Sequence, residues 1–469
     1  MLFTSSIFLY VFLPAVLAVF FLLGKIKSLR VTLVPFLILI SFVFYGYKDP
    51  TNVLLLLISI LTNYTLSQAI LRASSKTLFF WLGITFNLAF LGYFKYTNFI
   101  LGNLNTFGHS FEIMKIALPL AISFYTFQQI AYLADIKKGE VEDTSFKNYL
   151  LFVTFFPQLI IGPIVHHKEM MPQLRDKAFG NFSFENFKIG FFYLFAGLCK
   201  KLFLSDYCAQ IVDSVHADVV AGSSVTFADA WASALAFSFQ IYFDFSGYTD
   251  MAVGVAFMLG IVLPFNFNSP YKSRNVGEFW RRWHMTLSRW LRDYLYIPLG
   301  GNEKGPARAA VNAVIVFLLG GLWHGAAWTF VLWGALQGAG IVVSRYVQLL
   351  KIPIPLFVGV VLTFLFATLS WVLFRAASFD VAADLYAIML GKSGFDMSVR
   401  DVVVNNALIL FIATTITFTL PNTHVLVPKL AELTKKIPAL PIVVMIIIAW
   451  LSLAAFDLDS SAEFIYFDF

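Results

Sequence analysis

Charged residues are scarce in this chain. Asp, Glu, Lys and Arg together make up 13% of its 469 residues, whereas soluble domains carry about 25%. Hydrophobic residues reach 59% and the mean hydropathy is +0.78, which excludes a soluble globular or disordered protein. Although the net charge is +6, no basic soluble region exists that would bind nucleic acid.

Cysteine is nearly absent as well. The only two, Cys199 and Cys208, exclude a disulfide framework or a cysteine-rich metal site. The sequence also lacks the HExxH, CxxC, P-loop and GxSxG patterns. We therefore predict neither a metal site nor a serine triad.

The sequence is instead rich in long apolar runs. A membrane-spanning helix needs about 20 apolar residues, and the runs predict an all-α polytopic membrane protein with about eleven to fourteen segments. Residues 1–469 are expected to form a single integral-membrane domain. Two passes are expected in 229–262, and two passes or one broken pass in 309–345. The other candidate segments are 6–23, 31–47, 52–71, 78–100, 114–134, 148–166, 186–204, 355–374, 402–420 and 439–456.

Charge in the loops predicts the orientation. The stretches 24–30 (GKIKSLR) and 71–76 (LRASSK) are basic and 135–147 (DIKKGEVEDTSFK) contains three lysines, whereas 101–114 (LGNLNTFGHSFEIM) has no Lys or Arg. The basic loops are assigned to the cytoplasm, which puts the N-terminus outside. The first apolar segment has no basic region before it and no small-residue cleavage site, so it is expected to be retained as a helix.

Residues 269–302 hold the densest polar chemistry. A helix over 279–295 would separate a face rich in Trp and Leu from a face of arginines, as in a helix at the membrane interface. The arginines are either a positive-inside anchor or a clamp for an anionic cofactor, because guanidinium groups bind phosphate well. The candidate cofactor-binding residues are Arg281, Arg282, Lys272 and Arg274.

Two histidines occupy apolar settings. His284 falls within the apolar arc of the 279–295 helix, and His324 lies in LLGGLWHGAAWTF. Each on its own could be a packing residue, but polar groups inside membranes are costly and mark functional sites. Asp244 could orient a histidine or pair with an arginine, and the same alternatives apply to Asp250.

Further histidines and a proline-rich segment complete the polar inventory. His166 and His167 follow FFPQLIIGPIV and are expected to be solvated loop residues. Pro157, Gly162 and Pro163 within that segment predict a broken or re-entrant helix, and such breaks line cavities.

The segments EFWRRWHMTLSRWLRDYLYIPLGGN (278–302) and GGLWHGAAWTFVLWG (320–334) resemble the membrane-bound O-acyltransferase (MBOAT) family. Within it, the chain resembles the bacterial branch that contains the alginate and cellulose O-acetylation membrane subunits. The resemblance runs in order from Met1 to Phe469. Further matching stretches are LPLAISFYTFQQIAYLADIKKG, FFPQLIIGPIV, QIYFDFSGYTDMAVG and FNFNSPY.

The resemblance implies an MBOAT fold around a central cavity and transfer of an acyl group from a cytosolic thioester to a hydroxyl. Acetyl-CoA is the implied donor, and a separate extracytoplasmic acyltransferase then modifies an exopolysaccharide at the bacterial inner membrane. The resemblance makes His324 the catalytic histidine and His284 the second signature histidine. D-alanyl or lipid acyl transfer is the alternative within this class. A transporter with an intramembrane proton relay is the alternative outside it.

The chemistry of the residues agrees with acyl transfer. A neutral imidazole, whose pKa is about 6.5 before perturbation, can remove a proton from a hydroxyl as the thioester carbonyl is attacked. The C-terminal tail, residues 460–469 (SSAEFIYFDF), is unusually aromatic for a chain end. It is either an interfacial anchor or a segment that folds back into the cavity. In the second case Tyr466 would carry the acyl group.

Overall fold

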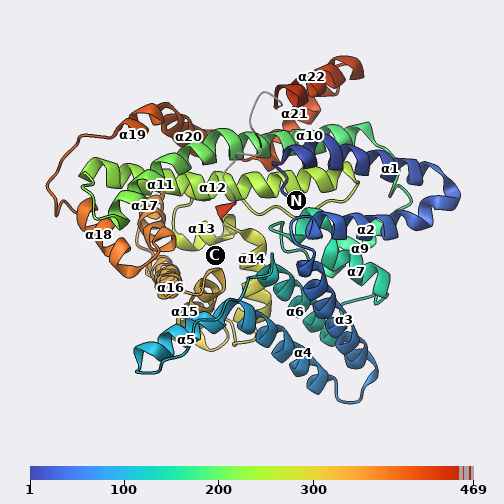
Figure 1. Cartoon of the computed structure of the whole chain (residues 1–469), viewed down its shortest axis with the longest axis horizontal. Coiled ribbons are helices and arrows are strands. Elements are labelled where there is room, and N and C mark those ends of the chain that lie inside the picture. The colour runs from blue at the N-terminus through green and yellow to red at the C-terminus, as the bar shows by residue number, and fades with distance from the viewer. Residues whose placement is uncertain (454–457, 459–463, 466–469) are drawn as a thin grey trace. The chain divides into compact units, whose positions relative to one another are not determined.

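The structure is a computed structural model that describes residues 1–453, 458, 464 and 465. Every regular element in these residues is a helix (Figure 1). This confirms the predicted all-α architecture, and long apolar helices make the chain a multi-pass membrane protein.

The chain folds as two compact units. Among the described residues, the first comprises 1–195, 248–265, 426–453 and 458, and the second comprises 196–247, 266–425, 464 and 465. Three helices contribute residues to both units: α10 (Phe184–Cys199), α12 (Phe227–Met258) and α21 (Thr423–Thr434).

The other helices each belong to one unit. The first unit contains η1 (Phe8–Phe12), α1 (Leu13–Lys25), η2 (Lys27–Thr32), α2 (Leu33–Gly46), α3 (Thr51–Arg72), α4 (Lys76–Leu91), η3 (Gly92–Tyr96), α5 (Thr97–Thr106), α6 (Ile122–Lys138), α7 (Phe146–Thr154), α8 (Phe156–Leu159), α9 (His167–Leu174) and α22 (Ala439–Ser452). The second unit contains η4 (Lys200–Ser205), α11 (Asp206–Val220), η5 (Pro270–Lys272), α13 (Val276–Arg282), α14 (Met285–Leu291), η6 (Arg292–Tyr296), α15 (Gly305–His324), α16 (Trp328–Leu349), α17 (Leu356–Arg375), α18 (Phe379–Met389), α19 (Asp401–Asn405) and α20 (Ala407–Thr419).

Within the described residues, seven helical stretches are long and apolar enough to cross a membrane, and the bent pair α20 and α21 would make an eighth. The expected eleven to fourteen segments exceed this number, because several apolar runs fold as short helices. Residues 148–166, for example, contain most of α7 and all of α8, and Phe155 interrupts the helix between the two. The break expected from Pro157 and Gly162 is therefore present.

The expected two passes in 229–262 are wrong, because α12 is one continuous helix of 32 residues. Its glycines serve close helix contacts and not a turn. A Cβ at Gly247 would lie 2.8 Å from the Gly197 carbonyl oxygen, and one at Gly254 would lie 2.5 Å from that of Gly190. These approaches explain why glycine occurs inside an uninterrupted helix.

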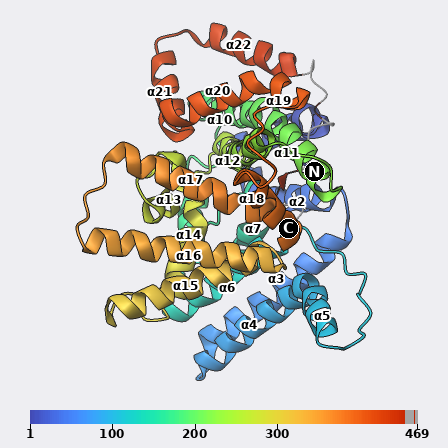
Figure 2. The same ribbon diagram turned by 90° about the vertical axis from the view of Figure 1, so that its left-hand side faces the viewer.

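Helices α15, α16 and α17 lie in a row (Figure 2), and they position the candidate site. The α15–α16 hairpin packs with its backbones almost in contact. A Cβ at Gly321 would lie 2.3 Å from the Phe330 carbonyl oxygen, and one at Gly334 would lie 2.2 Å from that of Phe317. Small residues allow such close packing between membrane helices, and here they fix the end of α15, where His324 lies.

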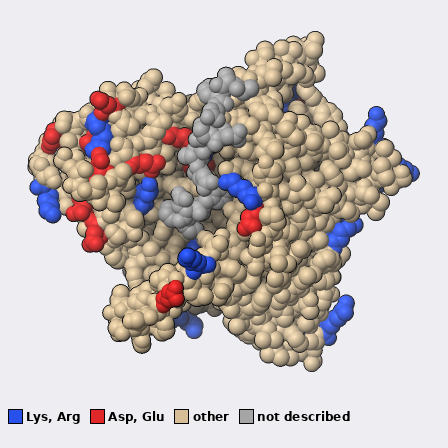
Figure 3. All heavy atoms as spheres, viewed as in Figure 1, with Lys and Arg blue, Asp and Glu red and all other residues tan. Residues whose placement is uncertain are grey.

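Charged side chains form isolated patches on the face drawn in Figure 3, most of which carries neither acidic nor basic groups.

Within the first unit, two histidines differ from expectation. His166 and His167 were expected to be solvated, but they are 6% and 2% exposed. The His166 Nδ1 lies 3.8 Å from the Asp135 carboxylate, and the His167 ring packs against Tyr132 and Phe152. The break after α8 returns the chain into the unit's interior and buries both imidazoles.

Candidate active site

The predicted continuous helix over 279–295 is wrong, because it breaks at Trp283 and His284. α13 ends at Arg282 and α14 begins at Met285, and His284 has a φ of +42°. The segment before α13 fills this break. The Asn268 N–H donates to the Arg282 carbonyl (2.9 Å), and the Met285 N–H donates to the Asn266 carbonyl (2.9 Å).

The predicted separation of faces survives the break. The apolar side chains that share the inner face are Trp280, Trp283, Leu287, Trp290 and Leu291, and all of them are buried. Arg281 and Arg292 are exposed. His284 lies on the inner face, as predicted, and is fully buried.

Asn266 fixes the protonation pattern of His284. The Asn266 side-chain oxygen accepts hydrogen bonds from the backbone N–H and the hydroxyl of Thr286 (3.2 and 2.6 Å). The His284 Nδ1 lies 3.3 Å from the same oxygen. Because this oxygen is an acceptor, Nδ1 is the donor, which puts the lone pair of the neutral ring on Nε2. Within the part of the chain that the structure describes, Nε2 is buried and has no hydrogen-bond partner.

His324 is the last residue of α15, and it is 4% exposed. Three aromatic rings surround its imidazole, with centroids 4.9 Å (Trp323), 5.2 Å (Trp333) and 5.5 Å (Phe374) away. The next residue must be small, because a Cβ at Gly325 would lie 2.2 Å from the ring of Phe330. The WHG sequence is thus a helix end that turns sharply inside a packed aromatic environment.

One tryptophan joins the two histidines. The Trp323 ring lies 4.9 Å from the His324 ring and 6.5 Å from the His284 ring. The Phe245 ring of α12 meets His284 edge-on from 4.7 Å. We call His284, His324, Trp323 and Phe245 the histidine cluster. The structure therefore brings together the two imidazoles that the sequence singled out.

The four candidate cofactor-binding cations separate into two places. Arg282 pairs with Glu278 (2.8 Å) and donates to the Asn268 carbonyl, while the Arg274 backbone N–H donates to Glu278 (2.9 Å). Partial burial raises the pKa of Glu278, but these two partners outweigh it and hold that pKa below its ordinary value. Lys272 donates to the Leu420 carbonyl (2.6 Å), and burial together with the charge of Arg282 lowers its pKa.

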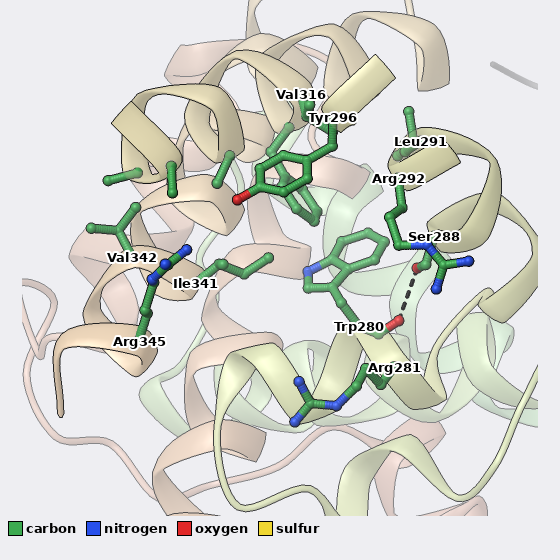
Figure 4. Close-up of a pocket in the computed structure, with 14 residues that line it drawn as sticks. Trp280, Arg281, Ser288, Leu291, Arg292, Tyr296, Val316, Ile341, Val342 and Arg345 are labelled. Atoms are coloured by element: carbon green, nitrogen blue, oxygen red, sulfur yellow. Dashed lines mark hydrogen bonds between the residues drawn. The ribbon is translucent and has the colours of Figure 1, made fainter. Parts of the chain in front are cut away.

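Arg281 lies elsewhere, on a half-open cavity of about 200 Å³ between α13–η6 and the α15–α16 hairpin. Apolar side chains such as Val316 and Phe317 line this cavity, and Arg292 and Arg345 join Arg281 at it. Figure 4 shows the three guanidinium groups around the cavity, with the ring of Trp280 between them. The arrangement suits an anion that also carries an apolar part.

Tyr466 lies outside the described residues, but its two predecessors are described and buried. The Ile465 N–H donates to the Asp244 carboxylate (2.8 Å), and the Phe464 ring packs 5.8 Å from that of Phe245. Asp244 also pairs with Lys201 (3.0 Å). A lysine is therefore among its partners, whereas the sequence suggested a histidine or an arginine.

The described residues contain no group of three or more His, Cys, Asp or Glu side chains that could hold a metal ion. Sequence reasoning missed Asn266, Lys201 and Trp323. FNFNSPY was a usable signal for Asn266, because a polar residue repeated between aromatic residues suggests a specific hydrogen-bonding role. Nothing in the local sequence indicates that Lys201 meets α12.

The fold and the site together define a class: a membrane protein that holds two buried imidazoles in one aromatic cluster. The model of the membrane-bound O-acyltransferase family matches residues 73–374. The chain belongs to this family and is an acyltransferase. Its membership decides between acyl transfer and the transporter alternative, in favour of acyl transfer.

Individual relatives support the same conclusion. The chain is 40% identical to the peptidoglycan O-acetyltransferase of Helicobacter pylori, over 85% of this chain and 81% of that protein. It is 38% identical to the probable alginate O-acetylase AlgI of Pseudomonas aeruginosa, over 85% of this chain and 76% of that protein. Identity to the teichoic acid D-alanyltransferase of Bacillus subtilis is 29%, over 46% of this chain and 56% of that protein.

Replacing Asn266 tests the construction of the site. Asn266→Ala leaves the donors of Thr286 and the His284 Nδ1–H without their buried acceptor, so we expect a loss of about 1–3 kcal/mol in unfolding free energy. The matched control is Asn268→Ala, because Asn268 contacts Arg282 across the break through its backbone, which the substitution keeps. We expect its unfolding free energy to change by no more than about 0.5 kcal/mol. Thermal unfolding in detergent compares the two variants, and equal stabilities would contradict the role of Asn266.

Proposed function

We propose that this O-acyltransferase takes an acetyl group from acetyl-CoA at the cytosolic side of a bacterial inner membrane. The acetyl group crosses the membrane on the protein, and a separate extracytoplasmic acyltransferase then places it on a polysaccharide. The N-terminus lies outside, and residues 1–469 act as one membrane domain in contact with lipid. The observation that carries this proposal is the pair of buried histidines that share Trp323.

The relatives favour acetyl over D-alanyl transfer. The peptidoglycan O-acetyltransferase of Helicobacter pylori and the probable alginate O-acetylase AlgI of Pseudomonas aeruginosa both align with 85% of this chain, and their names refer to O-acetylation. The D-alanyltransferase of Bacillus subtilis aligns with only 46% of it. This difference in coverage supports the acetyl donor and a polymer acceptor.

His324 acts as the general base in this proposal. It removes the proton from the attacking hydroxyl as the oxygen forms its bond to the thioester carbonyl carbon. The carbon–sulfur bond then breaks, and the proton passes to the leaving thiolate. Burial among Trp323, Trp333 and Phe374 excludes water, which would otherwise hydrolyse the thioester.

His324→Ala should therefore lower acetyl transfer by about 10²–10⁴-fold, the usual contribution of a general base. The matched control is His216→Ala, which removes another buried histidine of the second unit that lies outside the histidine cluster. Transfer of labelled acetyl from acetyl-CoA to polymer is measured, with detergent-solubilised yield as the check on folding. Near-normal transfer by His324→Ala would contradict the assignment.

His284 and the cations have different roles in the proposal. The Nε2 lone pair of His284 faces the buried interior and serves the reaction at the thioester. Of the four candidate cations, Arg281 holds the phosphates of the donor, and its location on the half-open cavity supports this. Arg282, Lys272 and Arg274 lie apart from this cavity, and their part in donor binding stays a prediction. Guanidinium groups bind phosphate through paired hydrogen bonds.

These roles predict opposite kinetic effects. His284→Ala should lower kcat with little change in KM for acetyl-CoA, whereas Arg281→Ala should raise that KM by about tenfold, the effect of losing one charged hydrogen bond. Arg308→Ala is the control, because Arg308 is exposed on α15 and does not line the cavity. Steady-state acetyl-CoA cleavage measures both constants. Equal changes in kcat and KM for both site variants would point to structural damage instead.

Tyr466 is the proposed carrier of the acetyl group. Its hydroxyl gives its proton to His324 and attacks the thioester, which produces an aryl ester and free thiol. The extracytoplasmic partner then takes the acetyl group and Tyr466 regains its proton. A phenol, with a pKa of about 10, needs such a base at neutral pH. The burial of Phe464 and Ile465 beside Phe245 supports a tail that folds inward.

Tyr466→Phe removes only the hydroxyl and keeps the aromatic ring. We expect it to abolish polymer acetylation and the acetyl–protein ester that mass spectrometry should detect when the partner is left out. Tyr207→Phe, an exposed tyrosine of α11, is the control. Full acetylation by Tyr466→Phe would show that the tail is an anchor without chemistry.

A further inference from the structure

A buried charge cluster lies where α12 meets the start of α11. The Lys201 ammonium group is 2.8 Å from the Asp206 carboxylate and 3.0 Å from the Asp244 carboxylate. Lys201 and Asp244 are 5% and 2% exposed. Lys201 therefore joins these two carboxylates.

Charges in such a position are costly unless their remaining lone pairs are also satisfied. One oxygen of Asp244 faces Lys201, and the other accepts the backbone N–H of Ile465 at 2.8 Å. Hydrogen bonds to an ionised acceptor are stronger than those between neutral groups. The Asp244 carboxylate therefore binds Lys201 with one oxygen and the C-terminal segment with the other.

A second contact lies next to this hydrogen bond and joins the neighbouring residues of the tail and of α12. Phe464 packs on Phe245, so two adjacent tail residues meet two adjacent residues of α12. Phe245 in turn meets the ring of His284 at 4.7 Å. The same turn of α12 thus binds the tail through Asp244 and contributes Phe245, which meets His284, to the histidine cluster.

We propose that Asp244, oriented by Lys201, is a positioning residue that holds the C-terminal tail at the histidine cluster. Chain ends are normally frayed, and a reacting group on a frayed end loses the rate advantage of fixed proximity. The hydrogen bond to Ile465 fixes the backbone immediately before Tyr466. The catalytic consequence rests on the proposed role of Tyr466, whereas the anchoring of the tail does not.

The sharpest test removes the donor and leaves the charge cluster intact. Ile465→Pro deletes the backbone N–H that Asp244 accepts, because proline has none. Ile465→Ala shortens the side chain and keeps the N–H, so it is the matched control. We expect Ile465→Pro to lower kcat for acetyl transfer by about 10- to 100-fold, the effect of losing a charged hydrogen bond, with KM for acetyl-CoA unchanged. Equal kcat for the two variants, with Tyr466→Phe inactive, would overturn the positioning role of Asp244.

A second measurement does not depend on catalysis. Amide hydrogen exchange of the C-terminal peptide, followed by mass spectrometry, should show a slow amide at Ile465 in the wild type and a fast one in Asp244→Ala. Asp229→Ala is the control, because it removes another buried carboxylate of α12, one that pairs with Arg400. Tail exchange that is equally slow in Asp244→Ala, or fast already in the wild type, would overturn the anchoring.

The two experiments separate this inference from the carrier role. If Tyr466→Phe is fully active while Asp244→Ala releases the tail amide, the carrier fails and the anchor holds. If Asp244→Ala does not fold because Lys201 loses its partner, Ile465→Pro still decides, since it preserves the ion pair between Lys201 and Asp244.

Discussion

A single amide oxygen, that of Asn266, supports the polar chemistry of this protein's interior. It accepts hydrogen bonds at the start of α14 and fixes which nitrogen of His284 carries the proton. In a chain with so few charged groups, an imidazole can be buried only if such a partner is supplied. The break between α13 and α14 exists because the 266–268 segment satisfies the backbone groups that a continuous helix would have satisfied internally.

Much of this arrangement follows from composition and periodicity. Apolar runs predict the helices, and the wheel of 279–295 predicts which side chains are buried even though the helix itself is broken. The break could not be predicted, because neither proline nor glycine occurs within RRWHM and its cause lies 18 residues earlier, at Asn266. A long-range hydrogen bond leaves no mark on local periodicity.

The same limit explains the other differences. His166 and His167 follow a helix-breaking segment, which normally indicates a loop, yet the chain turns inward there and buries both. α12 contains glycines that suggest a turn, but the helix α10 that packs against them requires small residues at those positions. In each case a tertiary contact overrides the structure that the local sequence indicates. The apolar settings of His284 and His324, by contrast, indicate their burial directly, and both are buried.

The place of His324 at the end of α15 has an electrostatic consequence. A helix carries about half a negative charge at its C-terminus, from carbonyl groups that no further turn satisfies. Gly325 leaves the helical conformation immediately after the histidine. The unsatisfied carbonyl groups therefore lie at the end of α15 that carries His324. In the proposed mechanism the imidazole takes up a proton during acyl transfer, and the new positive charge would form at this negative pole. The backbone of the hairpin would then supply the counter-charge that a carboxylate provides in a soluble triad.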